Sequence, residues 1–212
     1  MIAHLIARDV RRGFTGTSWL PIAFFVLVVA LMPFAVGPDA KLLSRVGAGV
    51  LWIAALTAAL LPIERLVEPD RANGVLDQLM LHGVADEAVA AAKIVAHWLT
   101  FGPLLLIAAV PGAALLALNG PTFVGAEVAL AVGTPGLAGL AIAVAAVTAG
   151  LPRAGSLAGL LLLPLAVPLL IFGAAAAADR NSSALMLEAA VSLLLTAGSP
   201  FVAAAAFRAS RT

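Results

Sequence analysis

The run FVGAEVALAVGTPGLAGLAIAVAAVTAG, residues 123–150, contains a single charged side chain, Glu127. A helix needs about 20 apolar residues to cross the hydrocarbon layer of a membrane, so this run predicts a transmembrane helix. The rest of the chain is similar: 63% of its 212 residues are hydrophobic, 11% are charged, and the mean hydropathy is +1.11. A soluble domain is only about 45–50% apolar. The composition therefore predicts an integral membrane protein.

Apolar runs of this kind recur along the whole chain. They are residues 18–37, 46–63, 94–117, 123–150, 155–177 and 184–207. Continuous apolar runs of this length do not suit the strands of a barrel, and backbone groups in lipid must bond within their own helix. We therefore expect an all-α integral membrane protein with six transmembrane helices. It would form a single permease domain over residues 1–212, without a separate soluble catalytic domain.

The distribution of lysine and arginine predicts the orientation. With six spans, both termini share one side of the membrane with residues 64–93, the one long connection. That side would hold Arg8, Arg11, Arg12, Arg65, Arg71, Lys93, Arg153, Arg208 and Arg211, whereas the other would hold Lys41, Arg45 and Arg180. The basic excess places both termini and the 64–93 loop in the cytoplasm.

The N-terminal residues 1–14, MIAHLIARDVRRGF, carry a basic face formed by His4, Arg8, Arg11 and Arg12. Apolar residues lie largely opposite, which predicts an amphipathic helix in the cytoplasmic membrane interface. A secretory signal peptide is the alternative interpretation. The apolar run that follows is longer than the roughly 7–15 residues of the hydrophobic region of a signal peptide, and it lacks a small-x-small cleavage pattern.

Charge is concentrated in the stretch LPIERLVEPDRANGVLDQLMLHG, residues 61–83. A short helix is predicted after Gly74, with Asp77 in its first turn and an apolar face formed by Val75, Leu76, Leu79 and Met80. A short amphipathic helix ringed by charge is a surface that a soluble partner can bind. An ordinary solvated loop fits the same periodicity, and the pattern alone leaves both open.

Several runs have the order and spacing of one known family: LMPFAVGP, GVLDQLML, AKIVAHW, GTPGL, LPRAGSLAGLLLLPLAVPLLIF and SPFVAAAAFR. Over essentially all six spans the chain resembles the CcmB family, haem exporter permeases of the cytochrome c maturation ABC complex. The resemblance implies an ABC-2-like permease of the bacterial inner membrane that forms a homodimer. Its partners would be a separate ATPase, the A protein of the complex, the membrane partners C and D and, through the C protein, a periplasmic haem chaperone.

The resemblance also implies that residues 64–93 form a coupling segment seated in a cleft of the ATPase. Glu64 and Arg65 would fix the angle at which this segment leaves the second span. Movement of the ATPase would displace residues 74–83 and, through rigid helices, the membrane spans.

The chain itself lacks a nucleotide-binding signature. A P-loop needs Gly-Lys followed by Ser or Thr, but Lys41 and Lys93, the two lysines, both follow alanine. Cysteine is absent, and His4, His82 and His97 fall in different predicted elements, which disfavours an intramembrane enzyme. We expect a transporter component without catalytic or metal-binding residues, surrounded by lipid, with no nucleic-acid partner and with ATP bound on its partner.

His97, followed by Trp98 at the start of the third span, is a candidate for a haem or transport path. A neutral imidazole ligates haem iron in many proteins, although a hydrogen bond to a neighbouring helix is the commoner use. Trp19, Trp52 and Trp98 lie outside the WG-x-W pattern of the haem-handling C proteins. We therefore expect the main haem site on another protein of the complex and no cofactor held firmly by this chain.

Glu127 and Glu188 lie about one turn inside the external ends of their spans. They would face a transport path or a partner, or their carboxylates would reach water by snorkelling. We favour snorkelling. Pro135 interrupts a helix in mid-membrane, where it would allow a kink or line a path. Gly155 and Gly159 form a small-x-x-x-small pair that favours close helix packing within the fold.

Two mechanisms fit these expectations. Haem crosses the membrane through this chain, or the chain transmits mechanical work that releases haem-loaded chaperone from the C protein. The missing tryptophan-rich motif favours the second. An ABC exporter permease for another amphiphile, of drug, lipid or polysaccharide type, is the alternative function.

Overall fold

The computed structural model describes residues 1–15, 19–152, 154–179 and 182–211, and every regular element within them is an α-helix. Arg153 and Arg180, which entered the count of basic residues, lie outside the described residues. In chain order the helices are α1 (Ile2–Gly13), α2 (Leu20–Val36), α3 (Ala40–Leu60), α4 (Ile63–Leu66), α5 (Glu68–Ala72), α6 (Val75–Leu81), α7 (Asp86–Leu115), α8 (Gly120–Thr148), α9 (Ala154–Asp179) and α10 (Ser182–Ala209).

Within the described residues, five helices are long and apolar enough to cross a membrane: α3, α7, α8, α9 and α10. The predicted class, an all-helical integral membrane protein, is confirmed. Helix α2 is also apolar but has only 17 residues. At a rise of about 1.5 Å per residue it is about 26 Å long, shorter than a hydrocarbon layer of about 30 Å. The sixth span therefore stays a prediction.

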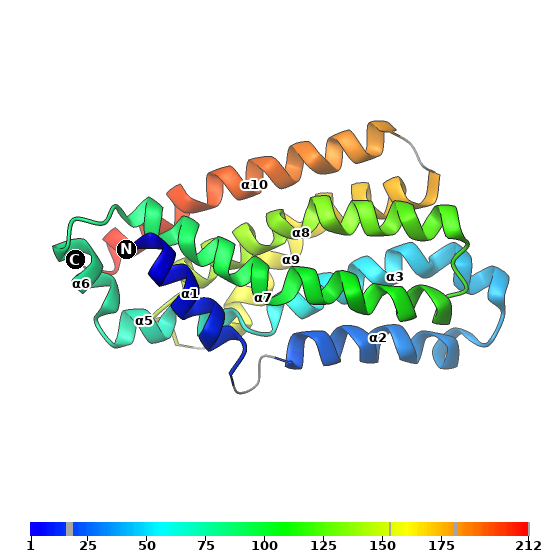
Figure 1. The fold of residues 1–212 in the computed structure, drawn as a ribbon, viewed down its shortest axis with the longest axis horizontal. Helices are drawn as coiled ribbons and strands as arrows, with labels where there is room; N and C mark the ends of the chain where they lie inside the picture. The colour runs from blue at the N-terminus through cyan, green and yellow to red at the C-terminus, as the bar shows by residue number, and fades with distance from the viewer. Residues whose placement is uncertain (16–18, 153, 180–181, 212) are drawn as a thin grey trace.

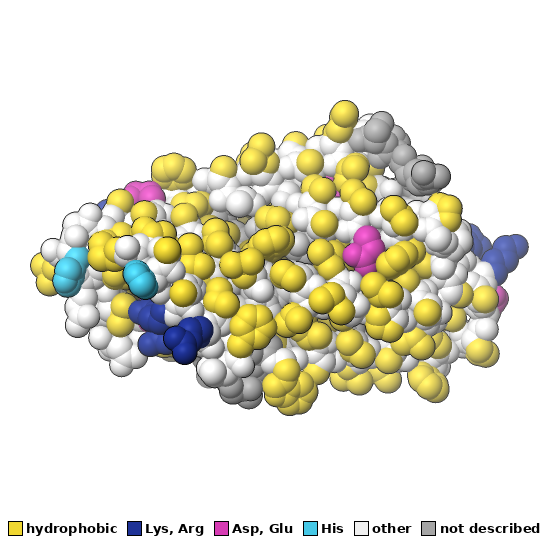
Figure 2. Space-filling model, viewed as in Figure 1, with side chains coloured by type: hydrophobic (Ala, Val, Ile, Leu, Met, Phe, Trp, Pro, Cys, Tyr) yellow, Lys and Arg dark blue, Asp and Glu magenta, His cyan; other side chains and the backbone are white. Residues whose placement is uncertain are grey.

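The long helices run side by side, and α8 packs against α3, α7, α9 and α10 (Figure 1). Both chain termini lie at the same end of the bundle as α5 and α6 (Figure 1). Figure 2 shows hydrophobic side chains over the middle of the face in view and basic side chains near its two ends. The charged segment and the termini thus share one end of an apolar bundle.

Close contact between α8 and α10 depends on glycine. A Cβ atom at Gly136 would lie 2.8 Å from the Cα of Ser192, and one at Gly139 would lie 3.0 Å from the carbonyl oxygen of Leu195. The Ser192 hydroxyl of α10 bridges two backbone groups of α8. It accepts from the Gly136 N–H at 3.1 Å and donates to the Val132 carbonyl at 2.6 Å. Pro135 disturbs the backbone hydrogen bonds of α8, and the Ser192 hydroxyl satisfies two of the backbone groups beside it. Helix α8 therefore continues past this proline to Thr148.

Candidate coupling segment and adjoining cavity

Helix α6 is the short helix predicted in the charged stretch. Gly74 precedes it with φ +69° and Gly83 follows it with φ +76°, left-handed conformations that glycine adopts without strain. Leu76 is only 4% exposed, whereas Met80 is 45% and Leu81 is 80% exposed. The predicted apolar face consisted of Val75, Leu76, Leu79 and Met80. Its residues do not share one environment, because Leu76 packs against the bundle whereas Met80 is exposed. The apolar surface open to a partner centres on Met80 and Leu81.

The C-terminus holds α6 against the bundle. Arg211 donates from Nη1 and Nη2 to the two carboxylate oxygens of Asp86, each at 2.9 Å. It also donates from Nε to Asp77 at 3.0 Å and from Nη2 to the Leu76 carbonyl at 3.1 Å. Beside it, Arg208 donates to Glu87 at 2.8 Å. One arginine thus joins α6, the start of α7 and the chain that leaves α10.

A cluster of buried charges joins α5 to α1 and α7. Asp70 is 3% exposed and accepts from Lys93 Nζ at 2.5 Å, from Arg8 Nη2 at 2.5 Å and from Arg12 Nη1 at 2.8 Å. Burial alone would raise the pKa of Asp70, but Lys93, Arg8 and Arg12 together hold that pKa below its ordinary value. Lys93 is 4% exposed and also donates to Asp9 and to the Leu66 carbonyl, each at 3.2 Å. The ammonium therefore uses all three of its donors.

Two acidic residues of the segment bind backbone N–H groups after the end of α8 and in the first turn of α9. Glu64 accepts from the backbone N–H of Gly155 at 2.8 Å, and Glu68 accepts from that of Gly150 at 2.8 Å. Bonds from Arg71, followed by the bond from Gly150, lower the pKa of Glu68. A Cβ atom at Gly155 would collide with the Glu64 carboxylate, so this glycine makes room for Glu64. The close neighbour of Gly155 is thus a carboxylate of α4, which lies at the N-terminus of α9 where the helix dipole favours a negative charge. A Cβ atom at Gly159, the other residue of the predicted pair, would meet no described atom within 4 Å.

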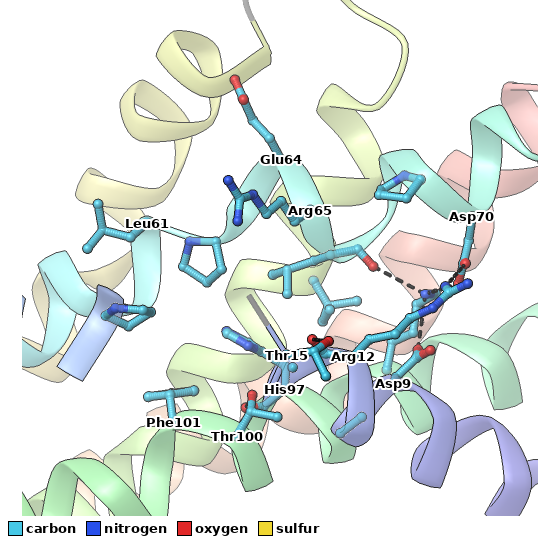
Figure 3. Close-up of a pocket in the computed structure, with 18 of the residues that line it drawn as sticks. Asp9, Arg12, Thr15, Leu61, Glu64, Arg65, Asp70, His97, Thr100 and Phe101 are labelled. Carbon is cyan, nitrogen blue, oxygen red and sulfur yellow. Dashed lines mark hydrogen bonds and ion pairs between the residues drawn. The ribbon is translucent and has the colours of Figure 1, made fainter. Parts of the chain in front are cut away.

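A cavity of about 450 Å³ lies beside this segment, between α1, α2, α4 and α7. Figure 3 shows Asp9, Arg12 and Asp70 on one side of it and Leu61 and Phe101 on the opposite side. His97 lines the wall between them, and Arg65 lines it from α4. The cavity therefore has a charged side and an apolar side.

His97 is 4% exposed, and no described residue forms a hydrogen bond with its Nε2 atom. Its ring packs against Phe101, with the ring centroids 4.8 Å apart. The neighbouring Trp98 points elsewhere, because its Nε1 donates to the Thr134 hydroxyl at 3.1 Å, one residue before Pro135. The structure thus places His97 in the cavity wall and Trp98 in the α7–α8 contact.

The two intramembrane glutamates differ in exposure. Glu188 is 0% exposed, so it does not snorkel to water as expected: the bundle encloses it. Its neighbour is Trp52, since a Cβ atom at Gly133 would meet both side chains. Neither carboxylate oxygen of Glu188, nor the indole N–H of Trp52, has a partner among the described residues. Glu127 is half-buried, and its Oε1 atom is likewise without a described partner.

The sequence predicted charge around the short helix, as a partner-binding surface or as a solvated loop, but it did not predict the burial of Asp70 and Lys93 or the part that Asp9 plays. The missed signal is the position of Lys93 in an otherwise apolar stretch next to a span, because a buried ammonium requires a carboxylate partner. The described residues contain no group of three or more His, Asp and Glu side chains arranged to hold a metal ion. Around the segment and the cavity, the described side chains present ion pairs and the imidazole of His97.

These features define a class: a polytopic α-helical membrane protein with a charged, helix-containing segment and both termini at one end of its bundle. A family model described as "CcmB protein" matches residues 1–210, so the chain belongs to the CcmB family, as the sequence resemblance predicted.

Curated relatives named "Heme exporter protein B" match over nearly their whole length. The one from Rhodobacter capsulatus is 42% identical over 212 residues, covering 96% of this chain and 97% of the relative. The one from Paracoccus denitrificans is 44% identical over 213 residues, with 96% and 97% covered. The one from Escherichia coli K12 is 42% identical over 196 residues, with 90% and 89% covered.

Proposed function

We propose that this chain is the membrane permease of an ABC-type complex that handles haem for cytochrome c maturation. Family membership and the name of its curated relatives, heme exporter protein B, support haem as the cargo. The observation that carries the coupling role is the exposed pair Met80 and Leu81 on a helix clasped to the bundle by Arg211. This pair is the docking patch for a separate ATPase protein.

The anchoring of the segment explains how a push on α6 would reach the membrane helices. Arg211 joins α6 to α7 and to the end of α10, Asp70 joins α5 to α1 and α7, and Glu64 joins α4 to α9. A movement of the docked ATPase would therefore be transmitted to several helices at once. These helices would move as rigid bodies.

The setting of this permease follows from the same proposal. The end that carries α6 and both termini faces the cytoplasm of a bacterium, and the chain lies in the inner membrane. Its partners are the ATPase (the A protein), the membrane partners C and D, a second copy of this chain and, through the C protein, a periplasmic haem chaperone. ATP hydrolysis on the ATPase drives haem export or the release of haem-loaded chaperone.

The test is copurification of the ATPase with Met80→Asp/Leu81→Asp. Two carboxylates in the docking patch should abolish retention of the ATPase, because charge would be buried without a partner. The matched control is Met80→Leu/Leu81→Met, which keeps the patch apolar and should retain the ATPase. Both variants are first checked for monodisperse elution in detergent. Equal retention of the ATPase by the two variants would refute docking at this patch.

A further inference from the structure

The cavity beside the coupling segment has an apolar side and a charged side. Its volume of about 450 Å³ lies within the range of roughly 300–1,000 Å³ typical of small-molecule sites. The apolar side includes the exposed side chains of Leu20 and Leu61 and, deeper, the ring of Phe101. The charged side includes Arg12 and Lys93. An occupant that matches both sides is an amphiphile with its charge at one end.

The balance of charge around the cavity favours an anionic occupant. Three cations serve two carboxylates in the buried ion cluster, which consists of Arg8, Arg12, Lys93, Asp9 and Asp70. Glu64 and Arg65 also line the cavity and balance each other in number. The Glu64 carboxylate binds the Gly155 N–H of α9 and points away from Arg12 (Figure 3). One positive charge is therefore left in excess beside the cavity.

Two exposed arginines line the cavity. The Arg12 side chain is 57% exposed, and among the described residues it donates to Asp70 from Nη1 only, so its Nε and Nη2 groups keep donors for a ligand. Arg65 lines the cavity from α4 and is exposed as well. Guanidinium groups suit phosphate, because their N–H donors match two of its oxygens at once. The charged end of the occupant is therefore best supplied by a phosphate.

An exposed tryptophan indicates the depth of this cavity in the membrane. Trp19 is 65% exposed and directly precedes Leu20, the lining residue at which the apolar helix α2 begins. Tryptophan is enriched where a membrane meets water, with its ring at the level of the lipid headgroups. Figure 2 shows basic side chains next to hydrophobic surface near this end of the bundle. Arg12 and Arg65 would thus lie at headgroup depth, and Leu20 and Leu61 beside acyl chains.

We propose that the cavity binds an anionic phospholipid of the phosphatidylglycerol type, with its phosphate at Arg12 and Arg65 and an acyl chain along Leu20 and Leu61. Basic pockets between membrane helices bind lipid headgroups in this way. A bound lipid would bridge α1, α2 and α4 beside the coupling segment. The inference uses the membrane class of the chain and not its cargo. Only the assignment to the cytoplasmic leaflet rests on the proposed function.

The test is a titration of the delipidated full chain in detergent micelles with phosphatidylglycerol or phosphatidylcholine, followed by native mass spectrometry. The wild type should bind phosphatidylglycerol more tightly than the zwitterionic lipid. Arg12→Gln and Arg65→Gln should each weaken phosphatidylglycerol binding by about fivefold, the value of one basic residue near an anionic lipid. Arg12→Lys keeps the charge and should weaken it less. The matched control is Arg11→Gln: Arg11 is exposed next to Arg12 but does not line the cavity, so binding should be unchanged.

Soluble glycerol phosphate separates a lipid site from a site for free phosphate esters. It lacks acyl chains, so an excess of it should leave phosphatidylglycerol bound, and its displacement of the lipid would overturn the proposal. Equal affinity of the wild type for the two lipids would also overturn it, as would unchanged binding in both glutamine variants at the cavity or an equal loss in Arg11→Gln. Arg65→Gln leaves the buried ion cluster intact, so its loss of lipid does not depend on a disturbed fold. The titration contains no ATPase, so its failure leaves the Met80/Leu81 docking test unaffected.

Discussion

The buried ion cluster predicts an asymmetry between Asp70 and Lys93. Asp70→Asn preserves the shape of the side chain but leaves the Lys93 ammonium, whose side chain is 3% exposed, without its nearest carboxylate. Removing one partner of a buried pair costs about 3–5 kcal/mol. We expect about 3 kcal/mol, the lower end of that range, because Asp9 still accepts from Lys93. Lys93→Met should cost less, because Asp70 keeps its bonds from Arg8 and Arg12.

The double variant Asp70→Asn/Lys93→Met tests whether the cost comes from the uncompensated charge. Without the ammonium, the asparagine no longer faces a buried cation, so the double variant should be more stable than Asp70→Asn alone. Coupling between residues in contact is typically about 0.5–3 kcal/mol. Glu87→Gln is the control: it removes an ion pair with Arg208, whose side chain is 54% exposed, and should leave stability unchanged.

The assay is unfolding of the purified chain in mixed micelles of dodecyl maltoside and increasing SDS, followed by tryptophan fluorescence. The absence of cysteine rules out thiol-reactive dyes, while three tryptophans supply the signal. The reasoning would be refuted if the loss of unfolding free energy in the double variant equalled the sum of the losses in the two single variants. It would also be refuted if Asp70→Asn were as stable as the wild type. Either result would mean that the cluster is solvated in the protein and that its charges do not depend on one another.

Three further predictions use the same assay. Gly136→Ala should destabilise the bundle by about 1–3 kcal/mol, because its Cβ would press on the backbone of α10, whereas Gly49→Ala, with open space around its Cβ position, should not. Acidification below the ordinary aspartate pKa of about 3.9 should destabilise the wild type more than Asp70→Asn. The folded-state pKa of Asp70 is depressed, so its contribution is full above that pH and is lost as the pH falls through the folded value. Glu188→Gln should leave the unfolding midpoint unchanged, because no described residue pairs with this carboxylate, while Glu188→Ala should lower the midpoint by opening a cavity.

The presence of the long apolar helices was predictable from the sequence, but the rotation of each helix about its axis was not. Runs such as residues 184–207 are apolar on every side, so no amphipathic pattern tells which face turns inward. For this reason Glu188 was placed near an interface and expected to snorkel, although the bundle encloses it. In the same way, α6 was predicted in the charged stretch, but nothing local to it indicates that Leu76 turns inward or that its carbonyl accepts from Arg211, 135 residues away in sequence.

Ion pairs between distant segments have no local signal. Asp70 bonds to Arg12 across 58 residues and to Arg8 across 62. The basic face of the N-terminal helix fits anionic lipid on amphipathicity alone, and nothing in its spacing shows that two of its arginines bind a carboxylate of the segment. Only the cost of burying Lys93 without a partner points toward the cluster, and it does not identify the partner.

The coupling segment and the adjoining cavity share residues, so a movement of the segment would change the cavity. Asp70 and Lys93 anchor the coupling segment and also line the charged side of the cavity, while Arg12 joins both. A displacement of α5 by a docked ATPase would therefore move the groups on the charged side of the cavity, without any long chain of intermediate contacts. Reciprocity follows from linkage: if ATPase docking changes the affinity of the cavity for a ligand, that ligand changes the affinity for the ATPase by the same factor. Because the shared element is a buried ion cluster with discrete partners, Asp70→Asn should abolish this coupling even in micelles where both ligands still bind.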